Sequence, residues 1–350
     1  MRRGYAAFIM LLAAALIVSP MAMKPLQAAE ATDMGMYFPI DIEGHWAYEE
    51  LDNFVMADLL KGYLDASGQV AVRPDHPITR AEFVALLVRV LGLTGVHSGK
   101  SFTDVQADKW YNEPIRIASS LGIVNGQNEY EFGPNKLIER GDIATMIMRA
   151  FQGTLTYVPY TNKLPFHDVP PYYASPYILE AYNAVIVNGI TEQSFKPFAN
   201  AKRSEAIVML KRALDAQQTD MPNGELLKSV ITASDTLEYN AINGQELGSL
   251  TEGYSKHYTA FQLAANQAYG EVLQAIADEG YAMSMEETSP RNMNVVMSTN
   301  RFAIVESFGG AARFTYSIDG EESVDTQSND GLYYLKKVED GTWKIYAVYQ

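Results

Sequence analysis

The chain of 350 residues has no cysteine, only five histidines and fewer basic than acidic side chains. The missing cysteine excludes disulfide bonds, thiolate metal sites and lipid attachment to a cysteine. With 27 Lys and Arg against 42 Asp and Glu, the formal net charge is −15, which disfavours nucleic acid as a partner. We expect no metal and no cofactor, because none of the histidines has the spacing of a zinc site: His45, His76, His97, His167 and His257.

Only one long apolar run is present, Ala6 to Val18, and it follows two arginines at the N-terminus. Small residues follow it, so residues 1–31 are predicted to be a signal peptide that is cleaved between about Ala28 and Ala31. An uncleaved N-terminal anchor is the alternative. Since no second run of this kind follows, the mature chain is expected to be exported, secreted and free of the membrane.

Three stretches of the chain repeat one another at fixed internal offsets. Their central arginines, Arg80, Arg140 and Arg203, lie 60 and 63 residues apart. In each copy a proline precedes this arginine by six residues and a second arginine follows it by nine, namely Pro74, Pro134 and Pro197, and Arg89, Arg149 and Arg212. A period of this length predicts an array of small structural units.

Each copy is predicted to fold as helix, loop and helix. An aromatic residue opens the copy before an apolar pattern of helical period, a glycine marks the loop, and a second helix begins at the repeated arginine. Thr79 and Glu82 form a capping box there, and Asp104 and Asp168 are expected to cap the first helices of their copies. Because one helix pair cannot bury its own apolar faces, the three pairs are expected to pack together.

The motif Ile78-Thr79-Arg80-Ala81-Glu82-Phe83, with the opening aromatic residue and the glycine loop, resembles S-layer homology (SLH) domains. The resemblance covers roughly residues 37–215 and places the repeats at 37–92, 100–152 and 164–215. The second and third copies depart from the motif but keep its arginine. The resemblance implies an all-α, pseudo-threefold helical bundle, in a protein held at the bacterial cell wall or in an S-layer.

The resemblance also implies a partner, an anionic secondary cell-wall polysaccharide that often bears pyruvate ketals. It assigns Arg80, Arg140 and Arg203 to the acidic group, since each begins a helix beside amide hydrogens expected to be free. Ion pairing of these arginines with neighbouring carboxylates is the alternative. We expect Arg140 to contribute least, and Arg89, Arg149 and Arg212 to act as structural salt-bridge partners. The residues that would contact sugar or shape the grooves are Trp46, Trp110, Tyr173, Gly62, Gly126 and Gly189. The aromatic residues could instead belong to the core.

Past a polar linker at residues 216–224, residues 225–350 are predicted to form an α+β domain. Helices are expected at 225–241, 247–254 and 258–277, across one face of a curved antiparallel sheet. Its strands are predicted at 294–298, 301–307, 311–318, 331–338 and 343–349, with hairpin turns at Asp319-Gly320 and Asp340-Gly341. The first helix and last hairpin resemble cone-shaped nuclear-transport-factor-like (SnoaL-like) domains.

No catalytic signature is present in this domain, and neither its ligand nor the oligomeric state follows from the sequence. His257 is expected at the surface or a pocket wall, and the acidic pairs Glu286-Glu287 and Glu321-Glu322 in solvated loops. Residues 220–350 carry a net charge of −11, so this domain should be repelled by an anionic wall polymer. We therefore expect a non-catalytic cargo tethered by the repeats; the alternative is a wall-anchored enzyme acting on a small substrate or glycan.

Overall fold

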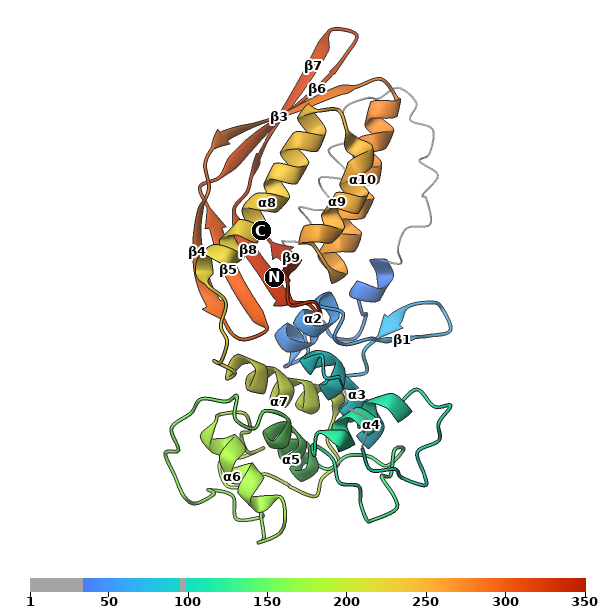
Figure 1. The fold of residues 1–350 in the computed structure, drawn as a ribbon, viewed down its shortest axis with the longest axis vertical. Helices are drawn as coiled ribbons and strands as arrows, with labels where there is room; N and C mark the ends of the chain where they lie inside the picture. The colour runs from blue at the N-terminus through green and yellow to red at the C-terminus, as the bar shows by residue number, and fades with distance from the viewer. Residues whose placement is uncertain (1–33, 95–98) are drawn as a thin grey trace. The chain divides into compact units, whose positions relative to one another are not determined.

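The computed structural model describes residues 34–94 and 99–350 (Figure 1). The predicted signal peptide lies outside the described residues. The chain divides into two compact units. The N-terminal unit comprises Pro39–Val55 and Leu59–Asp220, and the C-terminal unit comprises Met221–Gln350 with Met56–Asp58 and the described residues up to Phe38. The division at Asp220 falls within the stretch predicted as a linker.

The N-terminal unit is helical, with two helices in each repeat. The helices are α2 (Tyr48–Met56), α3 (Arg80–Leu91), α4 (Asn112–Ser120), α5 (Arg140–Ala150), α6 (Ser175–Asn183) and α7 (Arg203–Asp215). A two-stranded hairpin, β1 (Tyr63–Leu64) and β2 (Val70–Ala71), lies between the first two. The apolar stripes predicted for the second helices are buried, as in Phe83, Ile143 and Leu210, and form the core of this unit.

The capping box at the start of α3 is confirmed. The Thr79 side chain accepts from the Glu82 amide at 3.2 Å, and Glu82 Oε2 accepts from the Thr79 amide at 2.8 Å. The caps expected from Asp104 and Asp168 are wrong, because both carboxylates bind a later loop. Each accepts the two amide hydrogens just before the repeated proline, at 2.7 to 2.9 Å, and Asp41 does the same in the first repeat.

Backbone hydrogen bonds join the three repeats in a closed ring. The Ile78 amide donates to the Ala201 carbonyl at 3.1 Å, Ala201 donates to Ile138 at 2.9 Å, and Ile138 donates back to Ile78 at 3.0 Å. Each of these residues lies two positions before a repeated arginine. The starts of α3, α5 and α7 are thus tied together directly.

The C-terminal unit contains helices followed by strands, as predicted. After the short 3-10 helix η1 (Met34–Tyr37) come α8 (Gly224–Asn243), the 3-10 helix η2 (Leu247–Ser249), α9 (Leu250–His257) and α10 (Ala260–Asp278). The strands are β3 (Ala282–Ser289), β4 (Asn292–Ser298), β5 (Phe302–Phe308), β6 (Ala311–Ile318), β7 (Glu321–Ser328), β8 (Gly331–Lys337) and β9 (Trp343–Tyr349). They form two antiparallel ladders, β3-β6-β7 and β4-β5-β8-β9, where one sheet was expected.

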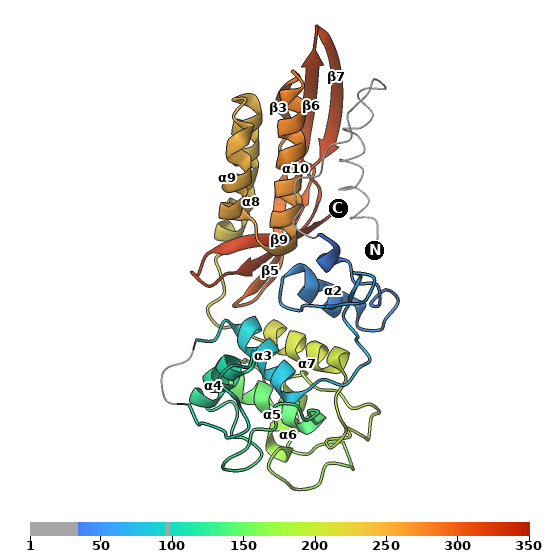
Figure 2. The ribbon, with the colours of Figure 1, turned by 90° about the vertical axis from the view of Figure 1, so that its right-hand side faces the viewer.

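The acidic pairs predicted in loops lie in strands instead. Glu286-Glu287 belongs to β3 and Glu321-Glu322 to β7, two strands that the sequence analysis did not find. Both strands are largely exposed: β7 has no apolar alternation, and β3 alternates only at Met283 and Met285. The backbone ladders with β6 hold them in place. The β6–β7 hairpin turns at Asp319-Gly320 as predicted, and Figures 1 and 2 show it reaching past the ends of the helices.

Helices α8, α9 and α10 pack together, and α8 and α10 contact the strands (Figure 2). The core between them includes Leu227, Ile231, Leu250, Leu273, Val305, Leu335 and Ile345, all at most 1 % exposed. The start of α10 is fixed to β9, because the Thr259 amide donates to the Ile345 carbonyl at 2.9 Å. Tyr258, one residue earlier, is thereby held in the interior.

Candidate functional site

The three repeated arginines are buried between the repeats. Arg80, Arg140 and Arg203 are 4 %, 5 % and 6 % exposed. Each Nε donates to a carbonyl of another repeat at 2.9 to 3.1 Å, and each guanidinium lies over an aromatic ring at 4.8 to 4.9 Å from its centre. The carbonyls are those of Phe132, Phe195 and Val72, and the rings are Phe132, Phe195 and Tyr63.

Each arginine also faces a carboxylate or hydroxyl of that other repeat. Arg80 pairs with Asp142, and Arg140 Nη1 donates to Glu205 Oε1 at 2.7 Å. In the third copy, Nη1 of Arg203 donates to the Tyr63 hydroxyl at 2.9 Å and lies 3.6 Å from Glu82 Oε1. Burial lowers the pKa of Arg140, while the charge of Glu205 opposes that shift and favours the cation. The arginines therefore join neighbouring repeats, which is the alternative weighed for them above.

The amide hydrogens expected to be free at the helix starts are occupied, so that expectation is wrong. The amides of Arg80, Arg140 and Arg203 donate to the carbonyls of Lys136, Ala199 and His76 at 2.9, 3.0 and 2.9 Å. The next amide in each helix is taken by a carbonyl of Pro134, Pro197 or Pro74. The physical reason is the close packing of one repeat's proline loop on another repeat's helix start. No anion site is left at these helix termini.

The opening aromatic residues are on the surface, not in the core. Trp46, Trp110 and Tyr173 are 62 %, 62 % and 58 % exposed. The structure therefore presents broad apolar faces to solvent next to the buried arginines, which is the arrangement that contact with a sugar ring requires.

Two grooves combine predicted residues from all three repeats. The first groove, of about 220 Å³, is lined by Gly62 of repeat one, Trp110 of repeat two and Arg203 of repeat three. The second groove, of about 310 Å³, is lined by Trp46 of repeat one, Arg140 of repeat two and Gly189 of repeat three. An arginine, a tryptophan and a loop glycine of the predicted set thus line each groove, and the sequence did not indicate which repeat supplies which of them.

In the remaining set of Arg80, Gly126 and Tyr173, the arginine and the tyrosine share one partner, Asp142. Asp142 pairs with Arg80 and also accepts a hydrogen bond from the Tyr173 hydroxyl. That bond, with burial, raises the pKa of the Tyr173 phenol well above its ordinary value. The polar groups of this set are thus engaged with one another.

The loop glycines are required by close approach of the backbone. A Cβ added at Gly189 would lie 2.0 Å from the Thr191 carbonyl oxygen, which the chain cannot accommodate without moving. At Gly126 the φ angle is +81°, in the left-handed region that favours glycine. Gly189 lines the second groove, so its turn forms part of the groove wall.

Among the described residues, two of the second arginines, Arg149 and Arg212, lack the salt bridges expected of them, while Arg89 Nη1 donates to the Leu59 carbonyl at 3.1 Å. In the described residues no carboxylate pairs with Arg149 or Arg212 as a salt bridge would require; Arg149 Nε donates to the Tyr177 hydroxyl at 3.2 Å. Arg89 and Lys61 line the first groove, and Arg212 lines the second. The signal that could have found them is their constant offset of nine residues, which puts them on the second helix of every repeat.

Membrane-spanning helices and metal sites are absent from residues 34–94 and 99–350. Within those ranges no helix is long and apolar enough to cross a bilayer. The same residues hold no group of three or more His, Asp or Glu side chains placed to bind a metal ion. His257 lies on α9, where burial and the neighbouring Lys256 and Lys344 lower its pKa.

Comparison with known proteins identifies the repeats. The family model for the S-layer homology domain matches residues 41–84, 101–144 and 165–207. The surface-layer 125 kDa protein of Lysinibacillus sphaericus is 33 % identical over 107 residues, which are 31 % of this chain and 9 % of that protein. The cellulosome-anchoring protein of Acetivibrio thermocellus is 26 % identical over 164 residues, 45 % of this chain and 36 % of that protein.

Some of the proteins that are similar to this chain are enzymes. An amylopullulanase of Thermoanaerobacterium thermosulfurigenes is 26 % identical over 182 residues, half of this chain and 9 % of that protein. The chain thus spans between about a tenth and about a third of these relatives. The matches indicate a secreted protein of the cell surface or wall. The N-terminal unit, with its three arginine-linked repeats, is an array of three S-layer homology domains.

Proposed function

We propose that the three domains anchor the chain non-covalently by binding an anionic, pyruvylated secondary cell-wall polysaccharide in the grooves between repeats. The observation that carries the proposal is the make-up of the two grooves. Each brings an exposed tryptophan, a loop glycine and a buried arginine from three different repeats to one place. A sugar ring would lie on the tryptophan, and its carboxylate would meet the cations.

The cations of the grooves are either buried arginines or more exposed basic side chains. In Arg140 and Arg203, Nε and Nη1 donate hydrogen bonds to other residues of the protein. Within the described residues no group accepts a hydrogen bond from their Nη2. Nη2 is the donor proposed to face the ligand. Arg212 and Lys61 line the grooves without such burial and supply further positive charge. In place of Arg140, which the sequence pointed to, Arg80 is proposed to contribute least, since its partner Asp142 is shared with Tyr173.

The assembly proposed for the three domains is pseudo-threefold. Each arginine contacts a different repeat, and the backbone ring through Ile78, Ala201 and Ile138 closes on itself. The C-terminal unit is proposed as an outward-facing cargo of the nuclear-transport-factor-like kind that binds and does not catalyse. An enzyme is the second candidate, favoured by the adjacent carboxyl groups of Asp235 and Glu238 in one cavity.

The anchoring proposal is tested by calorimetry of the mature full chain with purified wall polymer, before and after removal of its ketals. Trp110→Ala should weaken binding about tenfold, ~1.4 kcal/mol, because the stacking surface is lost. Arg212→Ala should weaken it severalfold, since it removes a cation at the groove rim. Removing the ketals should reduce binding to the wild type more than either substitution does.

Matched controls lie in the same unit outside both grooves. Tyr130 is as exposed as Trp110, and Arg116 is a surface arginine paired with Glu113. Tyr130→Ala and Arg116→Ala should bind like the wild type. Folded Trp46→Ala and Trp110→Ala proteins that both retain wild-type affinity would sink the proposal.

A further inference from the structure

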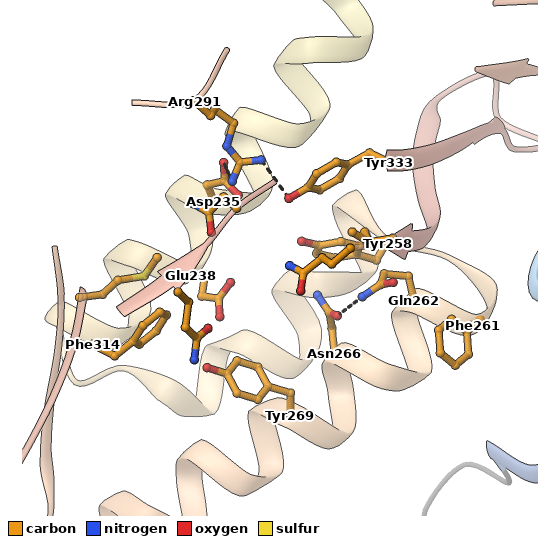
Figure 3. Close-up of a pocket in the computed structure, with 15 residues that line it drawn as sticks. Asp235, Glu238, Tyr258, Phe261, Gln262, Asn266, Tyr269, Arg291, Phe314 and Tyr333 are labelled. Carbon is orange, nitrogen blue, oxygen red and sulfur yellow. Dashed lines mark hydrogen bonds and ion pairs between the residues drawn. The ribbon is translucent and has the colours of Figure 1, made fainter. Parts of the chain in front are cut away.

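The C-terminal unit contains a cavity that the anchoring function does not use. It has a volume of about 160 Å³ and is lined by side chains of α8 and α10 and of strands β3, β6, β7, β8 and β9 (Figure 3). Such a volume holds several water molecules or one small organic molecule. Residues from both helices and both sheets converge there, so the site belongs to the folded unit and not to one surface loop.

Two carboxyl groups enter the cavity from α8. Asp235 and Glu238 are three residues apart, which puts them on the same face of the helix. Asp235 Oδ2 pairs with Arg291 Nη2 at 2.8 Å, and Arg291 Nη1 donates to the Tyr333 hydroxyl at 3.0 Å. The guanidinium is therefore already engaged by one carboxylate and one phenol.

Glu238 has no comparable partner. Among the residues that the structure describes, no donor hydrogen-bonds to its carboxylate and no cation pairs with it. Burial and the nearby Asp235 raise its pKa to about 7, while the more distant Arg291 opposes the shift. Burial also raises the pKa of Asp235, to about 6. When Asp235 and Glu238 are both ionised, their two negative charges exceed the one positive charge of Arg291 in the cavity lining.

The walls around Glu238 are aromatic and amide groups. Tyr258, Tyr269 and Phe314 line the cavity, and Figure 3 shows Tyr269 and Asn266 on α10 facing the space that Glu238 faces from α8. Gln262 Nε2 donates to Asn266 Oδ1 at 2.7 Å, so the amides form a polar edge. Aromatic faces attract cations, and amide oxygens accept hydrogen bonds from ammonium groups.

We propose that this cavity binds a small organic ammonium compound, a primary amine of about monosaccharide size. Its ammonium group pairs with Glu238 and donates to side-chain amide oxygens, while its carbon skeleton packs on Tyr269 and Phe314. An anion is disfavoured because Arg291 is occupied and Glu238 would repel it. At pH 8, where Glu238 is largely ionised, a neutral ligand would leave its charge without compensation, which is costly in a desolvated site.

The test uses the mature full chain and four probes followed by calorimetry and amide chemical shifts. Glucosamine and ethanolamine are primary ammonium compounds, N-acetylglucosamine is the neutral counterpart of the first, and choline is a quaternary cation. We expect both primary amines to bind and to shift residues of α8 and α10. We expect N-acetylglucosamine to bind at least tenfold more weakly than glucosamine, and choline more weakly than ethanolamine because it cannot donate hydrogen bonds.

Two variants distinguish binding in the cavity from non-specific attraction of amines to an acidic protein. Glu238→Gln keeps the shape of the side chain and should lower glucosamine affinity at least tenfold. Glu271→Gln removes the same charge from an exposed position on α10 and should leave affinity unchanged. The proposal is overturned if Glu238→Gln binds glucosamine like the wild type, if N-acetylglucosamine binds equally well, or if neither amine binds at millimolar concentration. None of these outcomes bears on wall binding, which is measured with polymer.

Discussion

The two units bury charge in opposite ways. In the N-terminal unit the three repeated arginines are buried, and each of Arg80, Arg140 and Arg203 meets an acidic side chain of another repeat. In the C-terminal unit the half-buried carboxyl group of Glu238 faces a cavity, and no cation among the described residues pairs with it. Desolvated charge is unfavourable unless compensated. A buried ion pair between repeats, here called a joint, therefore indicates a structural role. A charge without a partner beside a cavity indicates a place where a ligand could bind.

The largest effect is expected from breaking a paired joint. Arg140→Ala leaves Glu205 with its charge partly buried and removes the contact with the Phe195 carbonyl, so the N-terminal unit should lose about 3 to 5 kcal/mol of stability. Urea unfolding followed by tryptophan fluorescence measures this in a Trp343→Phe background, where only Trp46 and Trp110 report.

Removing both partners of this joint is the matched control. Arg140→Met combined with Glu205→Leu should recover part of the loss, because no unpaired charge remains. If Arg140→Ala unfolds within about 1 kcal/mol of the parent, the arginines are not structural joints and the comparison between the units fails.

The next effect is the pH dependence of the C-terminal unit. The pKa of Glu238 is raised from 4.5 to about 7 in the folded state, so the folded chain binds more protons than the unfolded chain between these values. Stability must then fall as the pH rises through this window, by about 1 to 3 kcal/mol. Glu238→Gln should flatten that slope and raise stability at pH 8.

The measurement is thermal or urea unfolding between pH 5 and 8. A Trp46→Phe, Trp110→Phe background leaves Trp343, in the core of the C-terminal unit, as the reporter. Glu271→Gln should keep the wild-type slope. A slope that is unchanged by Glu238→Gln would show that Glu238 is not desolvated.

The smallest effect is expected from a paired charge that is not buried. Arg313 and Glu286 lie 3.3 Å apart across β6 and β3, with side chains 50 % and 69 % exposed. Because water screens such a pair, Glu286→Ala should change stability by less than about 0.5 kcal/mol. Urea unfolding at low and high salt checks this. If Glu286→Ala lost as much stability as Arg140→Ala, burial would not explain why the ion pairs between repeats matter more than exposed ones.

The helices of the repeats could be predicted because their signals are local. The apolar stripe from Phe83 and the Thr79 cap lie within one helix, and both are present as expected. Strands β3 and β7 could not be predicted in this way. β7 has no alternating apolar residues and β3 has only Met283 and Met285, so the ladder with β6 is what makes them strands.

The residue types that line the grooves could be predicted from the sequence, but their grouping in space could not. The repeated offsets identified Arg140, Trp46 and Gly189, but nothing local says that three repeats contribute them to one groove. The partner of Arg140 is 65 residues away in the sequence. Glu238 gave no signal, because an acidic residue three positions after Asp235 is ordinary on a solvated helix. Only its position in a cavity lined by α8, α10 and the strands distinguishes it.

The closed ring of backbone hydrogen bonds through Ile78, Ala201 and Ile138 limits how this array can change in length. In an open solenoid a unit can be added or deleted at either end, because each unit contacts only its neighbours. Here every repeat has two neighbours, and the third closes on the first. A lost or gained repeat would leave a donor and an acceptor facing no partner. Anchors of this kind should therefore be inherited, transplanted and engineered as indivisible triplets.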